Sequence, residues 1–509
     1  MLALRERRKR LSALLPLDSW IWLLPIVLLA AALRLYHIGY NSLWFDEAFS
    51  WLVSQQTPIS ILTDTPPPIL PPAYHILLHY WTLLGDSETS LRLFSTTCSI
   101  MSIPVLYAIG RRLFGPKTGL ATSLLLAVLP FQVYFAQEAR LYSLVVLLAA
   151  IVLWLFVKAW DAEKLVPWLL LGIAIAAGFY THYFIAFTAL VLNGFVLLAQ
   201  PGDWRKVKGM FCADGIALVL VAPQLSSAFR QTREVATNFW LSKPSPLQPV
   251  VTLDFLLFSH TTPVWAVPLA LFVTLAILAL TVLMISYSDR EHRQWLWLFL
   301  SLTLLPPIFV FAISWLVGPA YLDRSFSVVT PAYALILGWA IAHLRWKSPT
   351  PFLFLALGGL VILSLVNHYS GLDPAKSPFR EASQTLKMNA ERGDAVLHLH
   401  CSSYLPFEFY HPPVDSYLLN NDPNSWIPAS TWAWAGRRIS SLDEFVVDRN
   451  RLWVVIMPNR MDEHQKDLSK QIEAEYQLQD TYEWDHWDPI EIRLYESTSP
   501  GRRESDETR

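Results

Sequence analysis

The chain has 509 residues, of which 53% are hydrophobic, with a mean hydropathy of +0.35 and a formal net charge of −2 at pH 7. This apolar content argues against a soluble globular protein of average composition and favours a membrane protein. The near-neutral charge gives no indication of nucleic-acid binding. Three cysteines, Cys98, Cys212 and Cys401, leave no basis for a disulfide framework or a Cys-rich zinc site.

Long apolar stretches recur along the first 369 residues. Because a hydrocarbon core is spanned by about 20 apolar residues, the sequence predicts about eleven membrane-spanning helices. The basic run Arg5–Arg10 resembles the start of a signal peptide, but no small-residue cleavage site follows it, so we expect an uncleaved first helix. The predicted spans are 19–36, 91–110, 119–136, 142–157, 166–181, 183–199, 210–229, 265–286, 295–317, 328–343 and 350–368.

Basic residues lie in alternate connections between these spans, as the positive-inside rule requires of cytoplasmic loops. The first opposite loop, residues 37–90, contains no Lys or Arg, and the second, residues 230–264, contains only Arg230, Arg233 and Lys243. We therefore expect a multi-pass protein of the inner (plasma) membrane with a cytoplasmic N-terminus and a periplasmic or extracytoplasmic C-terminal domain. The basic residues on the cytoplasmic side are Arg5, Arg7, Arg8, Lys9, Arg10, Arg111, Arg112, Lys117, Lys158, Lys164, Arg205, Lys206, Lys208, Arg290, Arg293, Arg345 and Lys347.

The composition changes after residue 369, where charged residues return and short alternating runs replace the long apolar ones. These patterns predict a small α/β soluble domain over residues 370–496, a membrane domain over 1–369 and a disordered polar tail over 497–509. Ser441 and Glu444 form a capping-box pattern that predicts a short helix. The other predicted elements are a helix at 378–391, a strand at 394–400, a strand at 451–457, a helix at 460–475 and a strand at 490–496.

The two long outer loops, 37–90 and 230–264, combine prolines with aromatic residues. In the first loop, the aromatic run 74–84 follows a Pro-rich stretch and predicts a short helix in the membrane interface. We expect both loops to flank a site.

Acidic and basic residues gather at the predicted outer ends of the spans. Charge within hydrocarbon is costly, so this layer indicates function rather than chance. Arginine offers a planar fork of donors suited to phosphate, and a carboxylate can take a proton from an attacking hydroxyl. By analogy with inverting glycosidases, direct displacement with Asp46 as the one base would invert the anomeric centre of a sugar, whereas retention would need a second nucleophile. The layer contains Arg34, Arg92, Arg140, Arg324, Asp46, Glu47, Glu138, His182 and Asp323.

Several short motifs occur in a fixed order along the chain, and together they resemble the GT-C glycosyltransferases, the group containing protein O-mannosyltransferases and the aminoarabinose transferases of lipid A. The segment 43–48 is similar to the Asp-Glu motif of that family. The others are Pro71-Pro72-Ala73-Tyr74, similar to Pro-Pro-Leu-Tyr; 137–142, similar to Gln-Glu-Ala-Arg-x-Tyr; 180–183, similar to a Thr-His-Tyr turn; and 379–382, similar to Trp-Arg-Glu-Ala.

This resemblance implies a GT-C type membrane domain, a dolichyl- or undecaprenyl-phosphate-linked sugar as donor, and no nucleotide site. It places Asp46, as base, and Glu47 in the catalytic set. Arg140, Arg92, Arg324 and Arg34 are the candidates for binding the donor phosphate, and Glu138, Tyr142, His182, Tyr183 and Tyr74 are the candidates for the substrate pocket. Residues 322–325 read Leu-Asp-Arg-Ser where relatives often have Pro-Arg-Tyr, which leaves the phosphate role of Arg324 open.

Other interpretations of these residues remain open. Asp46 and Glu47 are also compatible with solvated loop acids, the four arginines with structural anchors, and His182 with a capping residue. His398 and His400 alternate like metal ligands, but without a third ligand we interpret them as strand-surface residues and assign no metal. A divalent cation at Asp46 and Glu47 also stays open.

The predicted function is therefore sugar transfer from a polyprenyl-phosphate donor to a hydroxyl of a lipid, glycan or protein at the outer face. One alternative is a non-catalytic scaffold in envelope assembly, and another is a transporter or flippase that moves a lipid-linked glycan without chemistry. Transport sites of that kind lie near the midplane on broken helices of repeated halves, and the sequence shows neither midplane charges nor an obvious repeat.

Overall fold

The structure is a computed structural model that describes residues 20–63, 71–199, 202–238, 241–344, 350–370, 376–419, 438–439, 450–485 and 488–498. By its internal contacts the chain divides into two compact units. The first unit contains residues 1–38, 69–74 and 92–373, and the second contains residues 39–68, 75–91 and 374–509. The first outer loop is therefore largely grouped with the C-terminal part of the chain.

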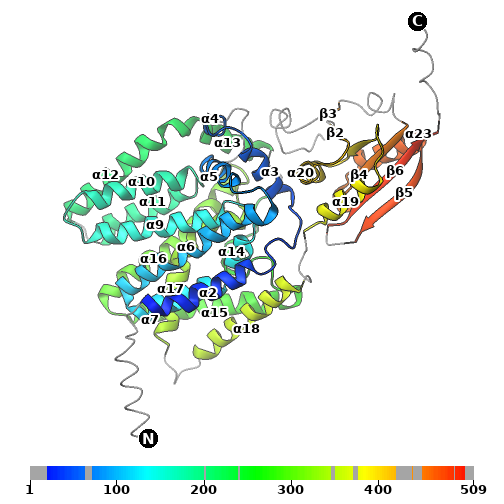
Figure 1. Cartoon of the computed structure of the whole chain (residues 1–509). Coiled ribbons are helices and arrows are strands. Elements are labelled where there is room, and N and C mark those ends of the chain that lie inside the picture. Colours follow the sequence, from blue (N-terminus) through cyan, green and yellow to red (C-terminus); the bar gives the residue numbers. More distant parts are fainter. Residues whose placement is uncertain are drawn as a thin grey trace. The chain divides into compact units, whose positions relative to one another are not determined.

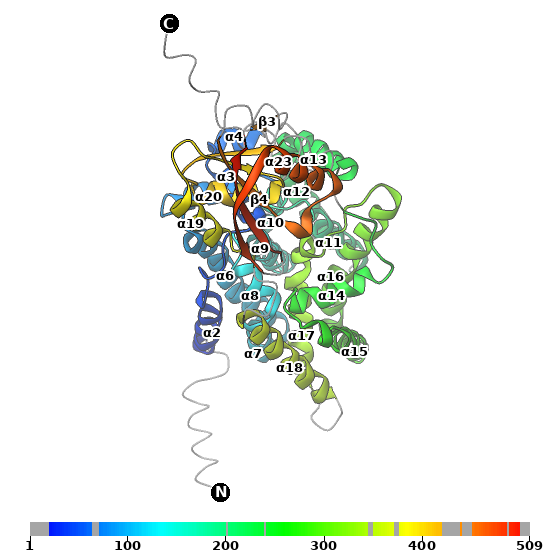
Figure 2. The same ribbon diagram turned by 90° about the vertical axis from the view of Figure 1, so that its right-hand side faces the viewer.

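The first unit is helical (Figures 1 and 2). Within the described residues, seven of its helices are long and apolar enough to cross a membrane, or eight if one bent pair counts as a single span. Its elements are η1 (Trp20–Trp22), α2 (Leu23–Leu35), α6 (Glu88–Phe114, from Arg92 onward), α7 (Pro116–Val128), α8 (Pro130–Ala136), α9 (Tyr142–Trp160), α10 (Val166–Phe179), α11 (Ile185–Ala199), α12 (Trp204–Val221), η2 (Ala222–Gln224), α13 (Leu225–Asn238), α14 (Gln248–Phe258), η3 (Val264–Ala266), α15 (Val267–Ser286), α16 (Arg290–Leu316), η4 (Asp323–Val329), α17 (Thr330–Ala342) and α18 (Thr350–Tyr369).

The chain is thus a multi-pass membrane protein, and each predicted span overlaps a helix. Three of the predicted spans, near 19–36, 166–181 and 183–199, correspond to apolar helices of 10–17 residues, which are shorter than the usual span. A further short apolar helix, α14, lies in the loop 230–264, where no helix was predicted. The count of eleven spans and the orientation of the termini stay predictions.

The predicted third span is broken, with α7 and α8 meeting at an angle of 55°. Pro130 has no N–H group, so the carbonyl of Leu126 loses the partner that a continuous helix would give it. Arg34 of α2 donates from Nη2 to this carbonyl over 2.7 Å and from Nη1 to the Ala127 carbonyl over 2.9 Å. Its Nε donates to Ser99 Oγ of α6, and its exposed fraction is 0%. This geometry favours the structural-anchor interpretation of Arg34 over phosphate binding.

The second unit combines short helices of the first outer loop with a sheet domain. The loop supplies α3 (Phe45–Ser54), α4 (Pro58–Thr63) and α5 (Ala73–Thr82, from His75 onward), so the aromatic run 74–84 is largely helical as predicted. The sheet domain contains α19 (Phe379–Asn389), β1 (Ala395–His398), α20 (Cys401–Phe409), β2 (Asp415–Leu419), β3 (Arg438–Ile439), β4 (Arg451–Ile456), η5 (Pro458–Arg460), α23 (Glu463–Glu475), β5 (Tyr476–Trp484) and β6 (Ile490–Ser497).

The strands form a mixed sheet in the order β3-β2-β1-β4-β6-β5. Strands β3, β2, β1 and β4 pair in parallel, and β6 is antiparallel to both β4 and β5. Successive side chains of a strand point to opposite faces. Leu452, Val454 and Ile456 of β4 accordingly join the core packed by α23, whereas Trp453 and Val455 join the core packed by α19 and α20. Both faces of the central strand are therefore covered.

The small α/β domain predicted from composition is confirmed as a sheet with packed helices. The predicted helices at 378–391 and 460–475 and the strands at 394–400, 451–457 and 490–496 correspond to α19, α23, β1, β4 and β6. Helix α20 and strands β2, β3 and β5 were not predicted. The capping box at Ser441 and nearly all of the predicted tail lie outside the described residues. The placement of this domain on the outer face stays a prediction.

His398 at the end of β1 lies inside the sheet domain with an exposed fraction of 0%, so the strand-surface interpretation was wrong for this residue. Its Nδ1 lies 2.9 Å from Ser403 Oγ and its Nε2 lies 3.0 Å from Ser416 Oγ. Since the Ser403 hydroxyl donates to the His400 carbonyl, it accepts from Nδ1–H. His400 does not share the strand, because its Nδ1 accepts from the Ser402 amide and caps α20.

We expect Arg34→Met to lower the Tm of the full chain in detergent. The carbonyls of Leu126 and Ala127 would stay buried without this donor, at a cost of about 1–3 kcal/mol each. Arg112→Met is the matched control, because Arg112 pairs with Asp161 at an exposed position and such pairs contribute about 0–1 kcal/mol. Thermal unfolding measures both variants, and equal losses of Tm would contradict the anchor role.

A second prediction concerns pH and His398. Burial lowers the pKa of His398 to about 3, below the ordinary value of about 6.5, so the fold holds the neutral ring. Below pH 6.5 the unfolded chain binds a proton that the folded chain does not, and stability falls by about 1.4 kcal/mol per pH unit. We expect Tm to fall less between pH 7 and pH 5 in His398→Gln than in the wild type. Equal falls in the two proteins would refute the assignment.

Candidate active site

The predicted catalytic acids lie in the first turn of α3, in the second unit. Trp44, in an extended conformation, precedes the helix, and its carbonyl accepts from the amides of Glu47 and Ala48. The free amides of a helix N-terminus favour carboxylates, which suits both acids at this position. Asp46 is partly exposed, whereas Glu47 has an exposed fraction of 0%. The two neighbouring carboxylates therefore have different surroundings.

Glu47 forms a buried ion pair with Lys376, from the segment that precedes α19. Lys376 Nζ donates to Glu47 Oε2 over 2.6 Å, and the Lys376 side chain is only 11% exposed. A buried carboxylate without a cation would be costly, and the ammonium of Lys376 offsets that cost. The catalytic assignment of Glu47 stays a prediction, and this geometry gives it a structural partner that the sequence did not identify.

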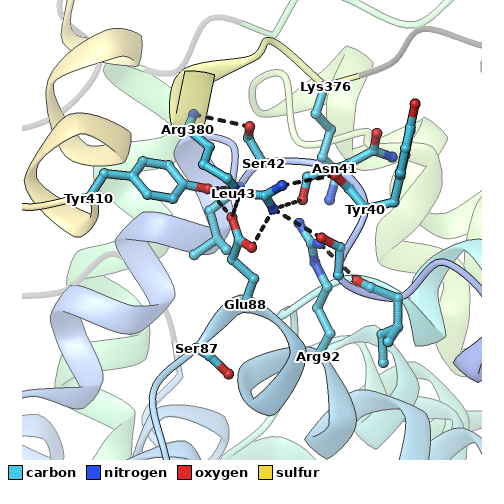
Figure 3. Close-up of polar contacts among 12 residues, drawn as sticks. Tyr40, Asn41, Ser42, Leu43, Ser87, Glu88, Arg92, Lys376, Arg380 and Tyr410 are labelled. Atoms are coloured by element: carbon cyan, nitrogen blue, oxygen red, sulfur yellow. Dashed lines mark hydrogen bonds and ion pairs between the residues drawn. The ribbon is translucent and has the colours of Figure 1, made fainter. Parts of the chain in front are cut away.

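A second charged cluster lies in the same unit around Arg380 (Figure 3). Arg380 Nε donates to Glu88 Oε1 over 3.0 Å, and its Nη2 also contacts Glu88. Burial lowers the pKa of Arg380, but the hydrogen bonds and charge of Glu88 outweigh it, so the pKa is raised. Burial and Glu88 raise the pKa of Tyr410, whose hydroxyl also donates to Glu88. Arg380 and Tyr410 therefore both keep their protons at neutral pH.

Arg380 belongs to one of the motifs found in the sequence, but Glu88, Tyr410 and Lys376 were not predicted as site residues. A signal for this arrangement was present, because the loop 37–90 contains acids and no Lys or Arg. Buried or half-buried acids in such a loop must find their cations elsewhere in the chain. Lys376 and Arg380 are the cations that the second unit supplies.

In the first unit, the segment 137–141 forms the turn between α8 and α9. The Gln137 side chain donates to the carbonyls of Arg34 and Tyr36 at the end of α2 and lies 2.9 Å from His368 Nε2. Two hydroxyls of α6 also donate to this region, Thr96 to the Ala136 carbonyl and Ser95 to the Arg140 carbonyl. Glu138 and Arg140 are both buried here. The turn that carries them is therefore fixed by three neighbouring helices.

Arg324 at the start of η4 lies over the ring of Tyr142, with its guanidinium carbon 5.9 Å from the ring centre. Two of the predicted site residues are thus brought together. Burial and the charge of Arg324 lower the pKa of His260, although Asp323 opposes them. Asp323 itself accepts hydrogen bonds from Gln248 and Thr252 of α14. In the segment 322–325, Asp323 therefore links η4 to α14 through these hydrogen bonds.

The motifs around Tyr74 and His182 also meet within the first unit. The Ala73 amide donates to the Tyr180 carbonyl over 2.9 Å, and the buried Tyr74 packs on Phe94. Burial lowers the pKa of His182 to about 4, and its Nδ1 accepts from the Phe184 amide, so the neutral ring carries its proton on Nε2. The Tyr183 hydroxyl donates to Gln231 over 2.7 Å. His182 thus caps a turn, as its alternative interpretation expected.

Arg92 in α6 is buried and donates from Nη1 to the Ile38 carbonyl over 2.9 Å. A backbone partner of this kind is compatible with an anchor, so its predicted phosphate role stays a prediction. Among the described residues, no group of three or more His, Cys, Asp or Glu side chains has an arrangement that could hold a metal ion.

The chain was compared with known proteins in sequence. A family model described as dolichyl-phosphate-mannose-protein mannosyltransferase matches residues 68–226. An undecaprenyl phosphate-alpha-4-amino-4-deoxy-L-arabinose arabinosyl transferase of Pseudomonas aeruginosa is 26% identical over 249 residues, which are 46% of this chain and 44% of that relative. A protein of the same description from Pseudomonas paraeruginosa is 29% identical over 154 residues, 28% of this chain and 27% of the relative. The matches thus span less than half the length of these curated relatives.

Two solved structures share the fold over nearly the whole chain. ArnT from Cupriavidus metallidurans in the apo state superposes with a TM-score of 0.62 and 13% identity, covering 93% of this chain and 97% of that one. The same protein bound to undecaprenyl phosphate gives a TM-score of 0.60 at 13% identity, covering 93% and 98%. The predicted resemblance is confirmed: in the sequence of residues 68–226 and in its fold, the chain is similar to the GT-C membrane glycosyltransferases.

Proposed function

We propose that the chain is a glycosyltransferase that moves a sugar from a polyprenyl-phosphate donor to a hydroxyl acceptor at the outer face of the inner membrane. The observation that carries this proposal is the difference between the two acids of α3. Glu47 is buried against Lys376, whereas Asp46, in the same helical turn, is partly exposed. The names of the sequence relatives support a lipid-linked sugar as the donor.

In the proposed reaction Asp46 is the general base. Its carboxylate takes the proton of the acceptor hydroxyl while that oxygen attacks the anomeric carbon of the sugar. The bond from that carbon to the phosphate oxygen breaks, and the polyprenyl phosphate leaves with the electron pair. Because a single carboxylate acts as base and no covalent sugar intermediate forms, the anomeric centre is inverted.

Negative charge grows on the phosphate as it leaves, and arginine is suited to bind it through paired N–H donors. We propose Arg140 and Arg324 for this role. Arg140 is fixed by the turn that Ser95, Thr96 and Gln137 hold, and Arg324 lies over Tyr142. The remaining predicted residues, Glu138, Tyr142, His182, Tyr183 and Tyr74, are proposed to line the substrate pocket.

The acceptor class follows only from the proposed chemistry: a hydroxyl on a lipid, a glycan or a protein. A divalent cation at the acids of α3 stays compatible with the reaction, since hard cations bind carboxylate oxygens.

Asp46→Asn is expected to lower the rate of sugar transfer by about 10²–10⁴-fold, because an amide cannot take the hydroxyl proton. Purified protein in detergent is supplied with undecaprenyl-phosphate-linked 4-amino-4-deoxy-L-arabinose as the first donor and with an envelope lipid extract as the source of acceptor hydroxyls, and released undecaprenyl phosphate is measured. Binding of undecaprenyl phosphate to the variant should be unchanged, which separates a lost base from a misfolded protein. Transfer at the wild-type rate would rule Asp46 out, and glycan movement across the bilayer without any transfer would favour a flippase.

Arg140→Gln is expected to weaken binding of undecaprenyl phosphate by about 10–150-fold, the worth of a hydrogen bond to a charged group. The affinity is measured by titrating the lipid phosphate against the full chain and the variant. Arg112→Gln is the control, because Arg112 pairs with Asp161 at an exposed position away from all predicted site residues in sequence. An unchanged affinity in Arg140→Gln would show that the donor phosphate binds elsewhere.

A further inference from the structure

The second unit must fix an acidic loop that has no cation of its own. Its loop residues 39–68 and 75–91 contain no Lys or Arg but include Asp46, Glu47 and Glu88. The segment 376–381 of the same unit brings Lys376 and Arg380 to this loop. These two cations contact the chain on either side of Asp46 in sequence.

On the upstream side, Arg380 binds the backbone that leads into α3 (Figure 3). Its Nη2 donates to the carbonyls of Gly39, over 3.0 Å, and Asn41, over 3.4 Å, and its Nη1 donates to that of Tyr40 over 3.3 Å. Nε, together with the same Nη2, binds both oxygens of Glu88 at the start of α6. One planar group therefore ties residues 39–41 to Glu88.

Ser42 and Leu43, the next residues, are held by the same region. The Ser42 hydroxyl accepts from the Arg380 amide over 3.1 Å and donates to Glu381 Oε2 over 3.2 Å. The Leu43 amide donates to the Tyr410 hydroxyl over 2.9 Å, and that hydroxyl donates to Glu88. Each residue from Gly39 to Ser42 thus contacts Arg380, and Leu43 is linked to it through Tyr410 and Glu88.

On the downstream side, Lys376 binds Glu47 over 2.6 Å, one residue after Asp46. The ring of Trp51 then packs edge-on against Phe409 of α20, with centroids 5.1 Å apart. The first turn of α3 is therefore held before and after Asp46 by residues of the C-terminal part of the chain.

We propose that Arg380 and Lys376 are positioning residues that set the orientation of the Asp46 carboxylate, with Glu88 and Tyr410 as the groups that hold Arg380. The inference rests on the proposed function in assigning Asp46 the catalytic role. It adds that the C-terminal domain is required for catalysis through these contacts. Small displacements of a reacting group cost large factors in rate, so a fixed helix start serves the reaction directly.

The geometry requires an arginine at position 380 and not merely a positive charge. Its contacts use both edges of a planar fork, toward a carboxylate and toward three carbonyls. The ammonium of a lysine is a point charge with freely rotating donors and cannot reproduce them together. Arg380→Lys therefore tests whether the planar guanidinium is required, because the variant keeps the positive charge.

The first arm of the experiment is hydrogen exchange on the full chain in detergent and needs no substrate. Arg380→Lys is expected to accelerate exchange at the amides of Leu43, Glu47 and Ala48 by about tenfold or more, while β4 and β6 keep their wild-type rates. Tyr410→Phe, which removes a single hydroxyl, should show a smaller acceleration at the same amides. Arg451→Lys is the matched control, since Arg451 pairs with Glu391 and Asp394 within the sheet domain.

The second arm measures consumption of undecaprenyl-phosphate-linked 4-amino-4-deoxy-L-arabinose in the presence of an envelope lipid extract that supplies acceptor hydroxyls. Arg380→Lys is expected to lower kcat at least tenfold with little change in KM for the donor, and Arg451→Lys is expected to change neither. Lys376→Arg, which keeps a donor for Glu47, should retain more of kcat than Lys376→Gln.

The two arms separate the failure of this inference from the failure of the proposed function. Wild-type exchange at the start of α3 in Arg380→Lys would overturn the inference whatever the activity. Faster exchange with an unchanged kcat would overturn it too, because Arg380 would then be only structural. If the wild type consumes no donor, the proposed function fails for that donor, and faster exchange confined to the start of α3 would still support the positioning contacts.

Discussion

The structure of the second unit depends on the burial of the Glu47 carboxylate. An ionised carboxylate removed from water is stable only with a cation and hydrogen bonds beside it. Lys376 meets this requirement, and because it belongs to the segment that opens the sheet domain, the ion pair joins residues 329 positions apart in the chain. Arg380 pairs with Glu88 in the same way, and these two residues are 292 positions apart in the chain. Two acids in a loop without cations therefore specify which distant segment the loop must contact.

In the first unit, buried backbone carbonyls rather than acidic side chains require hydrogen-bond partners from distant parts of the chain. Pro130 interrupts the third span and leaves buried carbonyls without a helical hydrogen-bond partner. The fully buried Arg34 donates hydrogen bonds to the carbonyls of Leu126 and Ala127. Where α2 ends, the Gln137 side chain donates to its last carbonyls. Unsatisfied backbone groups are especially costly at membrane depth. Some of the polar side chains that the sequence predicted to be functional therefore donate hydrogen bonds to the carbonyls at helix ends. Arg34 is the clearest case.

The sequence predicted the features that depend on local composition. Apolar runs predicted the membrane helices, because the free-energy cost of leaving apolar residues in water depends on the composition of each segment alone. Alternating runs predicted β4 and β6. Helix α20 was missed because Pro406 lies inside it and His400 caps it, signals that usually mark a loop. Glu88, Tyr410 and Lys376 were missed for another reason. Their partners are hundreds of positions away, and no periodicity in one sequence identifies a pairing of that range.

Asp46 and Glu47 show how adjacent acidic residues acquire different surroundings. Successive helix positions lie about 100° apart around the axis, so two neighbouring carboxylates cannot face the same surroundings. Here Glu47 faces the protein interior and Lys376, and Asp46 remains partly exposed. A base needs access to its substrate and a fixed orientation, and one side chain cannot easily combine exposure with many contacts. In the proposed reaction these two requirements are divided between neighbours: the buried acid fixes the helix, and Asp46 acts as the base.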